Sequence, residues 1–545
     1  MRRGTRDGTL AELRMLGRYA WALPGFVRAT LTPEEARRRV ERQLCERADT
    51  FLALLARGVY GNPRSPYRAL LGASGAELGD VATLVRAEGL ETALSTLRDA
   101  GVYVTLDEFK GRRPLERLGV SLPADHLHFD NPLQARHFRA ATGGSRGVRR
   151  RVSVDLDLLQ HEAAYHSLFR TTFALWDRPF ALWRVIPPSA SGVNNALRQV
   201  KVGQPVAAWF NPYRAGMNLE SLKFSLFTVY TVRAGRVCGA RLQSPDYCPP
   251  EQAARVATWL AERKSEGLPA VLDTQAALGV RVCAAAEKAG LDIAGTFFRI
   301  GGEPYTDGKA EIFARVGCRA VCHYTMAETG RIGVACGEPR AVDDVHFLSD
   351  KLAVLQRVKT LEPVGTSVAA LSYTTLLPSA SKLMLNVESD DYGVLEPRVC
   401  GCPFGELGLS LHLHGIRSYE KLTSEGNHFL GADLITLIDE VLPERFGGDP
   451  TDYQLAEEET SGLPKVSVVV RPGLGPVEDA EVVSTVLDFL RSNPRNRLMA
   501  DVWAAGDTLR VVRREPYMTS AAKILPLHIL DGPAEEALSA SAASS

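Results

Sequence analysis

The segment from residue 142 to residue 147 holds the residue types that bind phosphate. It reads Thr142, Gly143, Gly144, Ser145, Arg146 and Gly147, and three arginines follow it at 149–151. Glycines let backbone N–H groups approach an anion closely, hydroxyl groups add donors, and arginines add positive charge. A polyphosphate is the natural occupant of such a loop, and an ordinary surface loop is the alternative. The Gly-Lys-Ser/Thr ending of a Walker loop is absent, and the segment does not match a dinucleotide fingerprint in context.

Four more groups of residues offer chemistry further along the chain. They are Gly302, Glu303 and Pro304; Tyr324, Thr325 and Glu328; Asp391 with Arg417; and Lys523 near the C-terminal end. Taken one by one, these residues also have ordinary explanations: the tyrosine fits a core position, and the acids and bases fit surface positions. Their order is more informative, because a phosphate loop precedes a Tyr-x-x-x-Glu segment, an aspartate, an arginine and a late lysine.

Alternating apolar and helical runs beyond residue 150 must position these groups. Strands are predicted at 206–210 and 224–229, and helices at 250–264 and 278–290. Such alternation predicts an α/β fold built on an at least partly parallel sheet. Upstream, Thr32 and Pro33 predict a helix start, and helical spacing continues to Leu55. Shorter helices are expected across 78–99, and residues 1–30 form either a helix on the body or a loose arm.

The chain of 545 residues is too long for one compact core, so more than one domain is expected. A polar connection near 417–426 precedes a helix at 432–443, a strand at 466–470, a helix at 478–491 and a strand at 508–512. The expected fold class is therefore α/β, with a large N-terminal multi-layer α/β domain over 1–416 and a small mobile α+β C-terminal domain over 417–532. The Ala/Ser-rich tail at 533–545 is expected to be disordered.

Charge and cysteine usage narrow the class of protein. Lys plus Arg equals Asp plus Glu at 64 each, so no global field attracts nucleic acid or anionic lipid. No run approaches the roughly 20 apolar residues of a membrane span, and the N-terminus lacks the apolar core of a secretory signal. Nine cysteines favour a reducing compartment over a disulfide framework. The prediction is a cytoplasmic enzyme without nucleic-acid or membrane partners, with a homodimer as one option.

Together the motifs resemble the adenylate-forming enzyme superfamily. Within it, the chain is most similar to relatives of phenylacetate–coenzyme A ligase and of the acyl-protein synthetase of bacterial bioluminescence. The resemblance runs from about residue 40 to residue 530 and includes the segments 60–67, 101–105 and 108–111. It implies that ATP activates a carboxylic acid as its acyl-adenylate, that pyrophosphate leaves, and that the acyl group then passes to an acceptor.

The resemblance also implies a role for each matched residue. The loop 142–147 would grip the β- and γ-phosphates of ATP. The ribose and adenine would lie against Gly302, Glu303, Pro304, Tyr324, Thr325 and Asp391, with Tyr324 stacking on the adenine and Asp391 bonding the ribose. Glu328 would hold Mg²⁺, and Arg417 would contact ribose or phosphate. Lys523 would enter from the small domain and stabilise charge as the carboxylate attacks the α-phosphate.

Several positions depart from the usual pattern of the superfamily. Gly143 and Arg146 replace hydroxyl-bearing residues in the loop, and Thr325 stands where a glycine is usual. The segment after Arg417 reads Tyr419 and Glu420, and Lys523 follows an alanine. The key charges remain, so these departures indicate an atypical branch and leave the second half-reaction open.

Relatives of this type also carry a structural metal on a Cys, His and Cys-x-Cys set. The equivalent residues here are Cys336, His346, Cys400 and Cys402. Three thiolates and one imidazole would make a closed tetrahedral Zn²⁺ site, and inert buried cysteines with a surface histidine are the alternative. Cys318, Cys322 and His323 form a competing set, which we expect to serve as core and pocket lining because it leads directly into Tyr324.

The expected function is therefore an acid–thiol ligase that uses ATP and Mg²⁺, with an aromatic acid as substrate and coenzyme A as acceptor. The alternatives are an amine, hydroxyl or carrier-thiol acceptor, giving an amide, an ester or another condensation product in secondary metabolism. A non-catalytic paralogue that binds nucleotide or acyl ligand is the alternative from another class. The acid pocket is expected to be lined by residues before Tyr324 and by the segment 205–245.

Overall fold

The computed structural model describes most of the chain. The described residues are 3–141, 151–187, 189, 191–212, 219–361, 366–418, 423–424, 427–428, 431–460, 463–493, 500, 503–504, 509–519 and 523–530. The predicted phosphate loop at 142–147, the segment 419–422 and the predicted tail at 533–545 lie outside these residues. Among the described residues, no helix is both long enough and apolar enough to cross a bilayer.

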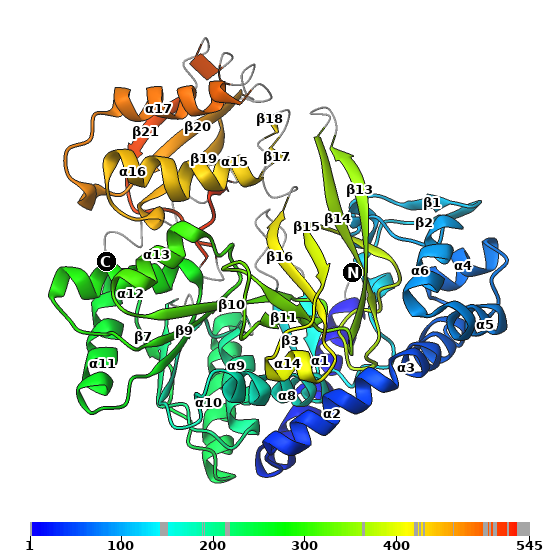
Figure 1. Cartoon of the computed structure of the whole chain (residues 1–545). Coiled ribbons are helices and arrows are strands. Elements are labelled where there is room, and N and C mark those ends of the chain that lie inside the picture. Colours follow the sequence, from blue (N-terminus) through cyan, green and yellow to red (C-terminus); the bar gives the residue numbers. More distant parts are fainter. Residues whose placement is uncertain are drawn as a thin grey trace.

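A mixed sheet of twelve strands forms the centre of the large body (Figure 1). In sheet order the strands are β13 (Leu352–Leu361), β14 (Thr366–Thr375), β15 (Val387–Pro397), β16 (Leu411–Ser418), β12 (Val345–Phe347), β11 (Gly330–Ala335), β10 (Arg319–Met326), β9 (Phe297–Gly301), β8 (Val271–Thr274), β5 (Phe180–Trp183), β6 (Ala208–Asn211) and β7 (Asp246–Tyr247). Strand β10 pairs parallel with β9 and antiparallel with β11. It therefore divides a parallel half from an antiparallel half.

The strands of the parallel half bury both of their faces. On β5, Phe180 and Leu182 belong to one apolar cluster, whereas Ala181 and Trp183 belong to the other. Successive side chains of a strand point to opposite faces, so the two clusters lie on the two sides of the sheet. Near-continuous apolar runs are the sequence mark of such doubly covered strands. The large body is therefore a layered α/β domain, as the sequence predicts.

Helices cover both faces. On one face lie α11 (Ala253–Ser265), α12 (Ala276–Ala289) and α13 (Asp307–Arg315). On the other lie α8 (Leu156–Thr172) and α9 (Ser191–Lys201), with α1 (Arg3–Arg28) and α10 (Leu219–Val237) packed outside them. Helix α2 (Pro33–Cys45) also packs on α8. The N-terminal segment is thus a helix on the body rather than a loose arm.

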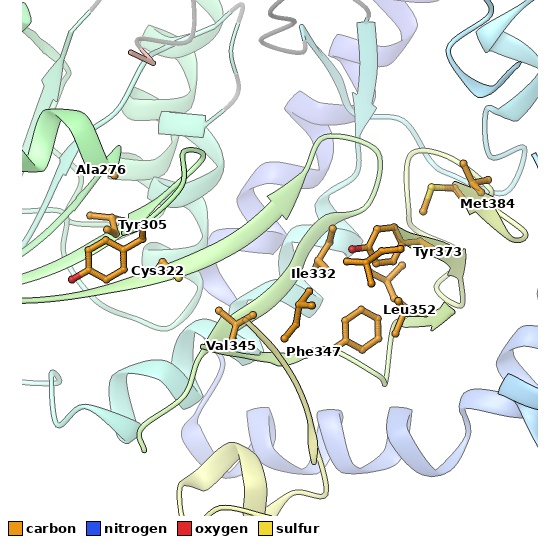
Figure 2. Packing of buried hydrophobic residues seen from close by; sticks show 14 of the residues in the cluster. Ala276, Tyr305, Cys322, Ile332, Val345, Phe347, Leu352, Tyr373 and Met384 are labelled. Atoms are coloured by element: carbon orange, nitrogen blue, oxygen red, sulfur yellow. The ribbon is translucent and has the colours of Figure 1, made fainter. Parts of the chain in front are cut away.

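The antiparallel half of the sheet carries the second part of the core. Helices α3 (Arg47–Leu54), α4 (Pro66–Ala73), α5 (Leu78–Glu88), α6 (Leu90–Asp99) and α7 (Leu106–Phe109) supply side chains to it. Figure 2 shows Phe347 of β12 beside Tyr373 of β14, with ring centroids 6.3 Å apart and nearly parallel planes. The short strands β1 (Leu115–Arg117) and β2 (Val120–Leu122) form one hairpin. The short strands β3 (Phe138–Ala141) and β4 (Arg151–Val154) pair antiparallel beside α8.

The C-terminal unit has its own sheet and its own core. The sheet order is β21 (Leu509–Arg513), β20 (Leu463–Val470), β19 (Tyr453–Thr460) and β22 (Leu527–Leu530). Its helices are α15 (Gly431–Thr436), α16 (Leu442–Phe446) and α17 (Asp479–Ser492), and the π-helical turn η5 (Leu437–Val441) joins the first two. In Figure 1 this unit, in orange, lies beside α12 and α13. The two predicted helical segments and the strands β20 and β21 agree with the sequence prediction, whereas the strands β19 and β22 were not predicted.

One predicted strand is wrong. Residues 224–229 lie inside helix α10, where the buried positions 228, 231, 232 and 235 recur at helical spacing. The apolar run Phe224 to Val229 was short enough to fit either period, because runs of this length do not distinguish a strand from a buried helical segment.

Candidate active site

Two cavities meet at the carboxyl ends of β9 and β10. The first has a volume of about 190 Å³ and the second about 230 Å³. They share Gly302, His323, Thr325 and Lys523 in their walls. In α/β sheets, ligands bind outside the carboxyl ends of the strands, where the topology changes. The position of the two cavities follows that rule, because β10 is the strand at which the sheet changes from parallel to antiparallel.

The first cavity collects most of the residues predicted for nucleotide binding. Those in its wall are Gly302, Glu303, Pro304, Tyr324, Thr325, Asp391, Arg417 and Lys523. They come from the end of β9, from β10, β15 and β16, and from the C-terminal unit. Residues more than 200 positions apart are therefore brought together. Cys322 and His323 also line this cavity and Cys318 is buried, as expected for the competing cysteine set.

Lys523 approaches the large body at Gly302. A Cβ atom built on Gly302 would lie 3.2 Å from the Lys523 Cε and 3.4 Å from its Nζ, and Gly302 has φ +91°. The position thus requires glycine both for its backbone conformation and for the close approach of the lysine. The residue after the lysine anchors this segment to the large body, because the Ile524 backbone N–H donates to Glu303 Oε1 at 3.0 Å.

Glu303 joins the two parts of the molecule rather than facing open space. Its second oxygen, Oε2, accepts the backbone N–H of Ala277 at the start of α12, at 2.7 Å. Burial raises the pKa of Glu303, and the N–H donors from Ala277 and Ile524 oppose that rise. One carboxylate thus holds the N-terminus of a body helix and the lysine-bearing segment together.

Tyr324, Asp391 and Arg417 lie around the same cavity. The Tyr324 hydroxyl donates to Asp391 and accepts from the Tyr373 hydroxyl at 3.2 Å. Burial, and then the Asp391 charge, raise the pKa of Tyr324 well above its ordinary value. Arg417 donates from Nη1 to Asp343 at 3.2 Å. Asp343 was not predicted, and its other contacts, to the backbone N–H groups of Gly415 and Ile416, explain why it belongs here.

Glu328 lies apart from the first cavity. Its Oε1 accepts from Lys110 Nζ at 2.7 Å, and the side chain is buried. Burial opposes ionisation, but Lys110 outweighs it and lowers the pKa of Glu328. The carboxylate is therefore charged, as a cation ligand must be, and its present partner is an ammonium group.

The second cavity has charged walls. Glu162 of α8, Arg198 of α9 and Arg331 of β11 line it, together with Arg184 and Asp273 at the ends of β5 and β8. No phenylalanine, tyrosine or tryptophan is among the described residues of its wall. The described part of the segment 205–245 lines neither cavity, and 184–198 lines the second one instead. The place of that segment in the acid pocket stays a prediction, since residues 213–218 lie outside the described part of the chain.

Four predicted zinc ligands come together at the far end of β12. Cys400 Sγ lies 3.8 Å from Cys336 Sγ and 3.5 Å from Cys402 Sγ. His346 Nε2 lies 3.0 Å from Cys402 Sγ and 3.5 Å from Cys400 Sγ. Two sulfurs bound to one tetrahedral zinc lie about 3.8 Å apart, given Zn–S bonds of about 2.3 Å. The spacing and the burial of all four side chains thus fit a closed zinc site.

The surroundings of this cysteine–histidine cluster also fit a metal. His346 Nδ1 lies 2.7 Å from the carbonyl oxygen of Leu409, so Nδ1–H donates there and leaves the Nε2 lone pair facing the thiols. His412, not predicted, also lies within ligand distance of the Cys336, His346 and Cys400 set. Its Nδ1 is held by Asp344 at 2.9 Å. In the sequence, the His412-x-His414 pair that follows Cys402 is the signal that could have pointed to His412 as a further metal ligand.

No protein-family model matches the chain, and no curated protein matches it. Among solved structures, the chain is similar to a 2-hydroxyisobutyryl-CoA ligase in complex with 2-HIB-AMP and CoA, at 15% identity and a TM-score of 0.43 over 95% of this chain and 94% of that one. It is also similar to ATP-bound MatB from Rhodopseudomonas palustris, at 12% identity and a TM-score of 0.40 over 78% and 70% of the two chains.

A third similar structure is O-succinylbenzoate coenzyme A synthetase (MenE) from Bacillus subtilis in complex with AMP. It is 11% identical, with a TM-score of 0.41 over 74% of this chain and 71% of that one. At such identities the function of this chain has to be argued from its own side chains.

Proposed function

We propose that this protein is an ATP-dependent ligase that converts a carboxylic acid to its acyl-adenylate and then transfers the acyl group. The observation that carries the proposal is the place of Lys523, which lies in the wall shared by the two cavities. The first cavity would take the nucleotide and the second the acid. A lysine between them lies where a carboxylate and an α-phosphate would meet.

In the proposed first step, an oxygen of the acid attacks the α-phosphorus of ATP. The bond to the β-phosphate breaks, pyrophosphate leaves, and an acyl–AMP anhydride forms. Negative charge grows on the α-phosphate oxygens, and the Lys523 ammonium would stabilise it. Positioning and electrostatics dominate such phosphoryl chemistry, so no protein nucleophile is required.

The nucleotide contacts would come from the first cavity. Tyr324 would stack on adenine, Asp391 would accept the ribose hydroxyls, and Arg417 would contact ribose or phosphate. Mg²⁺ bound at Glu328 would neutralise phosphate charge, and this requires the Lys110 partner to move away. The loop 142–147 would hold the β- and γ-phosphates.

In the second step, an acceptor attacks the acyl carbon and AMP leaves. We favour coenzyme A, which would give a thioester, and we infer that the C-terminal domain over 417–532 moves between the two steps. An aromatic acid remains the preferred substrate by resemblance alone. An amine, hydroxyl or carrier-thiol acceptor is the alternative, as is a paralogue that binds nucleotide or acyl ligand without turnover.

The test is acid-dependent release of pyrophosphate from ATP across a panel of acids, with and without coenzyme A. Lys523→Ala is expected to lower the rate by about 100- to 1,000-fold, the usual effect of removing one transition-state donor. Lys264→Ala, which removes a half-buried lysine of α11 that pairs with Asp292, is the matched control. Unchanged release in Lys523→Ala would overturn the role of this lysine, and nucleotide binding without release from any acid would favour the non-catalytic paralogue.

A further inference from the structure

The charged groups around the second cavity do not balance. Five cations, Arg184, Arg198, Arg299, Arg331 and Lys351, are buried together with three carboxylates, Glu162, Asp273 and Asp350. Buried charges are costly unless they are paired. Among the residues that the structure describes, this buried cluster therefore has an excess of two cations, which a bound anion would balance.

Most of these cations already have carboxylate partners. Glu162 pairs with Arg198 and with Lys351, the latter at 3.2 Å. Asp273 pairs with Arg184 at 2.5 Å and also with Arg299. Each of the two carboxylates thus forms ion pairs with two cations.

Arg331 is the exception. Its side chain is 1% exposed, and only its backbone N–H bonds a carboxylate, Glu162 Oε1 at 2.6 Å. No hydrogen bond or ion pair joins its guanidinium to any residue that the structure describes, and Nη1 is buried without an acceptor. A guanidinium offers five donors in a fork that matches a carboxylate or phosphate. Leaving such a group buried without a counter-charge is destabilising, and a bound anion would offset that cost.

The histidines beside the cluster do not add to its charge. Burial, and then Arg299 for His166 and Arg331 for His323, lower the pKa of each ring well below its ordinary value. His323 and Asn194 also line the second cavity, and both keep buried polar atoms without a partner among the described residues. The cavity therefore offers neutral polar groups next to the unpaired guanidinium.

We infer that the acid substrate carries a second anionic group, which binds Arg331 while the reacting carboxylate lies at Lys523. This rests on the proposed function and adds the substrate class, a small dicarboxylic acid or an acid with an equivalent second anion. The cavity would hold the two ends of the substrate between two cations that come from different parts of the molecule.

The test compares acids that differ only in the second anion: glutarate against valerate, and terephthalate against benzoate. Binding to the full-length protein without ATP is measured by calorimetry, and pyrophosphate release is measured with the same acids. We expect each diacid to bind at least 10-fold more tightly than its monoacid partner. Arg331→Met should abolish the difference and raise the melting temperature of the ligand-free protein, because it removes an unpaired buried charge.

Arg331→Lys keeps a cation and should retain part of the preference, which guards against a misfolded Met variant. Arg357→Met, on β13 and paired with Asp99, is the matched control and should change nothing. Equal affinity for both members of each pair, a diacid preference that survives Arg331→Met, or no binding of any acid would each overturn the inference. Arg331-dependent diacid binding without pyrophosphate release would instead uphold the inference and contradict the proposed function.

Discussion

The hydrogen-bond partners of individual buried side chains in this protein cannot be predicted from the sequence. His166 is an example: its Nε2 lies 2.6 Å from Gln199 Oε1, and its Nδ1 lies 2.6 Å from Arg299 Nη1. Nε2–H therefore donates to the amide, and Nδ1 accepts from the guanidinium, so the ring is neutral. At this scale the sequence predicted much of the wall of the first cavity but not the charged residues of the second. Glu162, Arg184 and Arg331 look like ordinary helix and strand charges until the fold buries them.

The neutral histidines make stability depend on pH. In the unfolded chain a histidine takes up a proton below about pH 6.5, whereas the folded protein keeps His166 neutral. The unfolded state then binds more protons, so the stabilisation is complete above that pH and is lost as the pH falls. The slope is about 1.4 kcal/mol per pH unit for each such histidine.

Urea unfolding at pH 7.5 and pH 5.5 checks this expectation. His166→Gln should reduce the loss of stability between the two values by about 1.4 kcal/mol per pH unit. Thr258→Ala, at an exposed position of α11 that carries no titratable group, is the control and should leave the slope as it is. An unchanged slope in His166→Gln would show that His166 titrates normally in the folded protein.

At the scale of elements, the order of strands and helices was largely predictable, since strand–helix alternation is a strong signal. The strand predicted at 224–229 failed because its apolar run fits two periods, and only packing on the helical layer decides between them. The sequence did not predict which residues meet across the sheet. Cys336 and Cys400 meet because β12 pairs with β16, and no local pattern encodes that pairing.

The cysteine–histidine cluster yields a prediction at this scale. It joins the end of β11, the strand β12 and the turn before α14 (Pro403–Glu406), so a bound zinc would hold the neighbouring strands β11 and β12 to a turn far along the sequence. The purified protein is expected to hold about one zinc per chain, and Cys400→Ser should lower that content and the melting temperature.

The zinc prediction is checked by elemental analysis of the metal content and by thermal melts before and after chelation. Cys248→Ser, at a buried cysteine outside the cluster, is the control and should keep its metal. A wild-type protein that holds no zinc, and whose melting temperature does not change on chelation, would contradict the assignment of a zinc site.

The whole molecule consists of two bodies that meet at the site. Besides the Glu303 bond, a buried ion pair joins them: Lys309 Nζ of α13 lies 2.9 Å from Asp439 Oδ2 of η5, and Thr306 also donates to that oxygen, at 2.8 Å. A polar break near 417–426 was enough to predict a C-terminal unit. The docking contacts were not predictable, because an aspartate inside a helical segment looks the same whether it faces solvent or a second domain.

The Lys309–Asp439 contact between the two bodies should determine what fraction of the molecules has Lys523 in the wall shared by the two cavities. Asp439→Ala leaves Lys309 buried without its partner, which costs about 3 kcal/mol or more. We expect slower adenylation by at least about 10-fold and faster hydrogen exchange in residues 523–530. The double variant Lys309→Met with Asp439→Leu should recover part of both, because an apolar pair can replace a buried ion pair.

Pyrophosphate release and hydrogen-exchange mass spectrometry report the two quantities separately. Asp488→Ala, at an exposed position on α17, is the matched control. Normal exchange at 523–530 in Asp439→Ala would show that the ion pair does not hold the docked arrangement.

Strand β10 serves both cavities with consecutive residues, since His323 and Thr325 lie in the shared wall and Tyr324 lies in the first cavity. A mutation on this strand would therefore change both cavities at once. Arg198 of α9 and Arg331 of β11 touch only the second cavity. The proposed acid substrate could therefore change through α9 and β11, whereas β10 is expected to vary slowly among homologues of this protein.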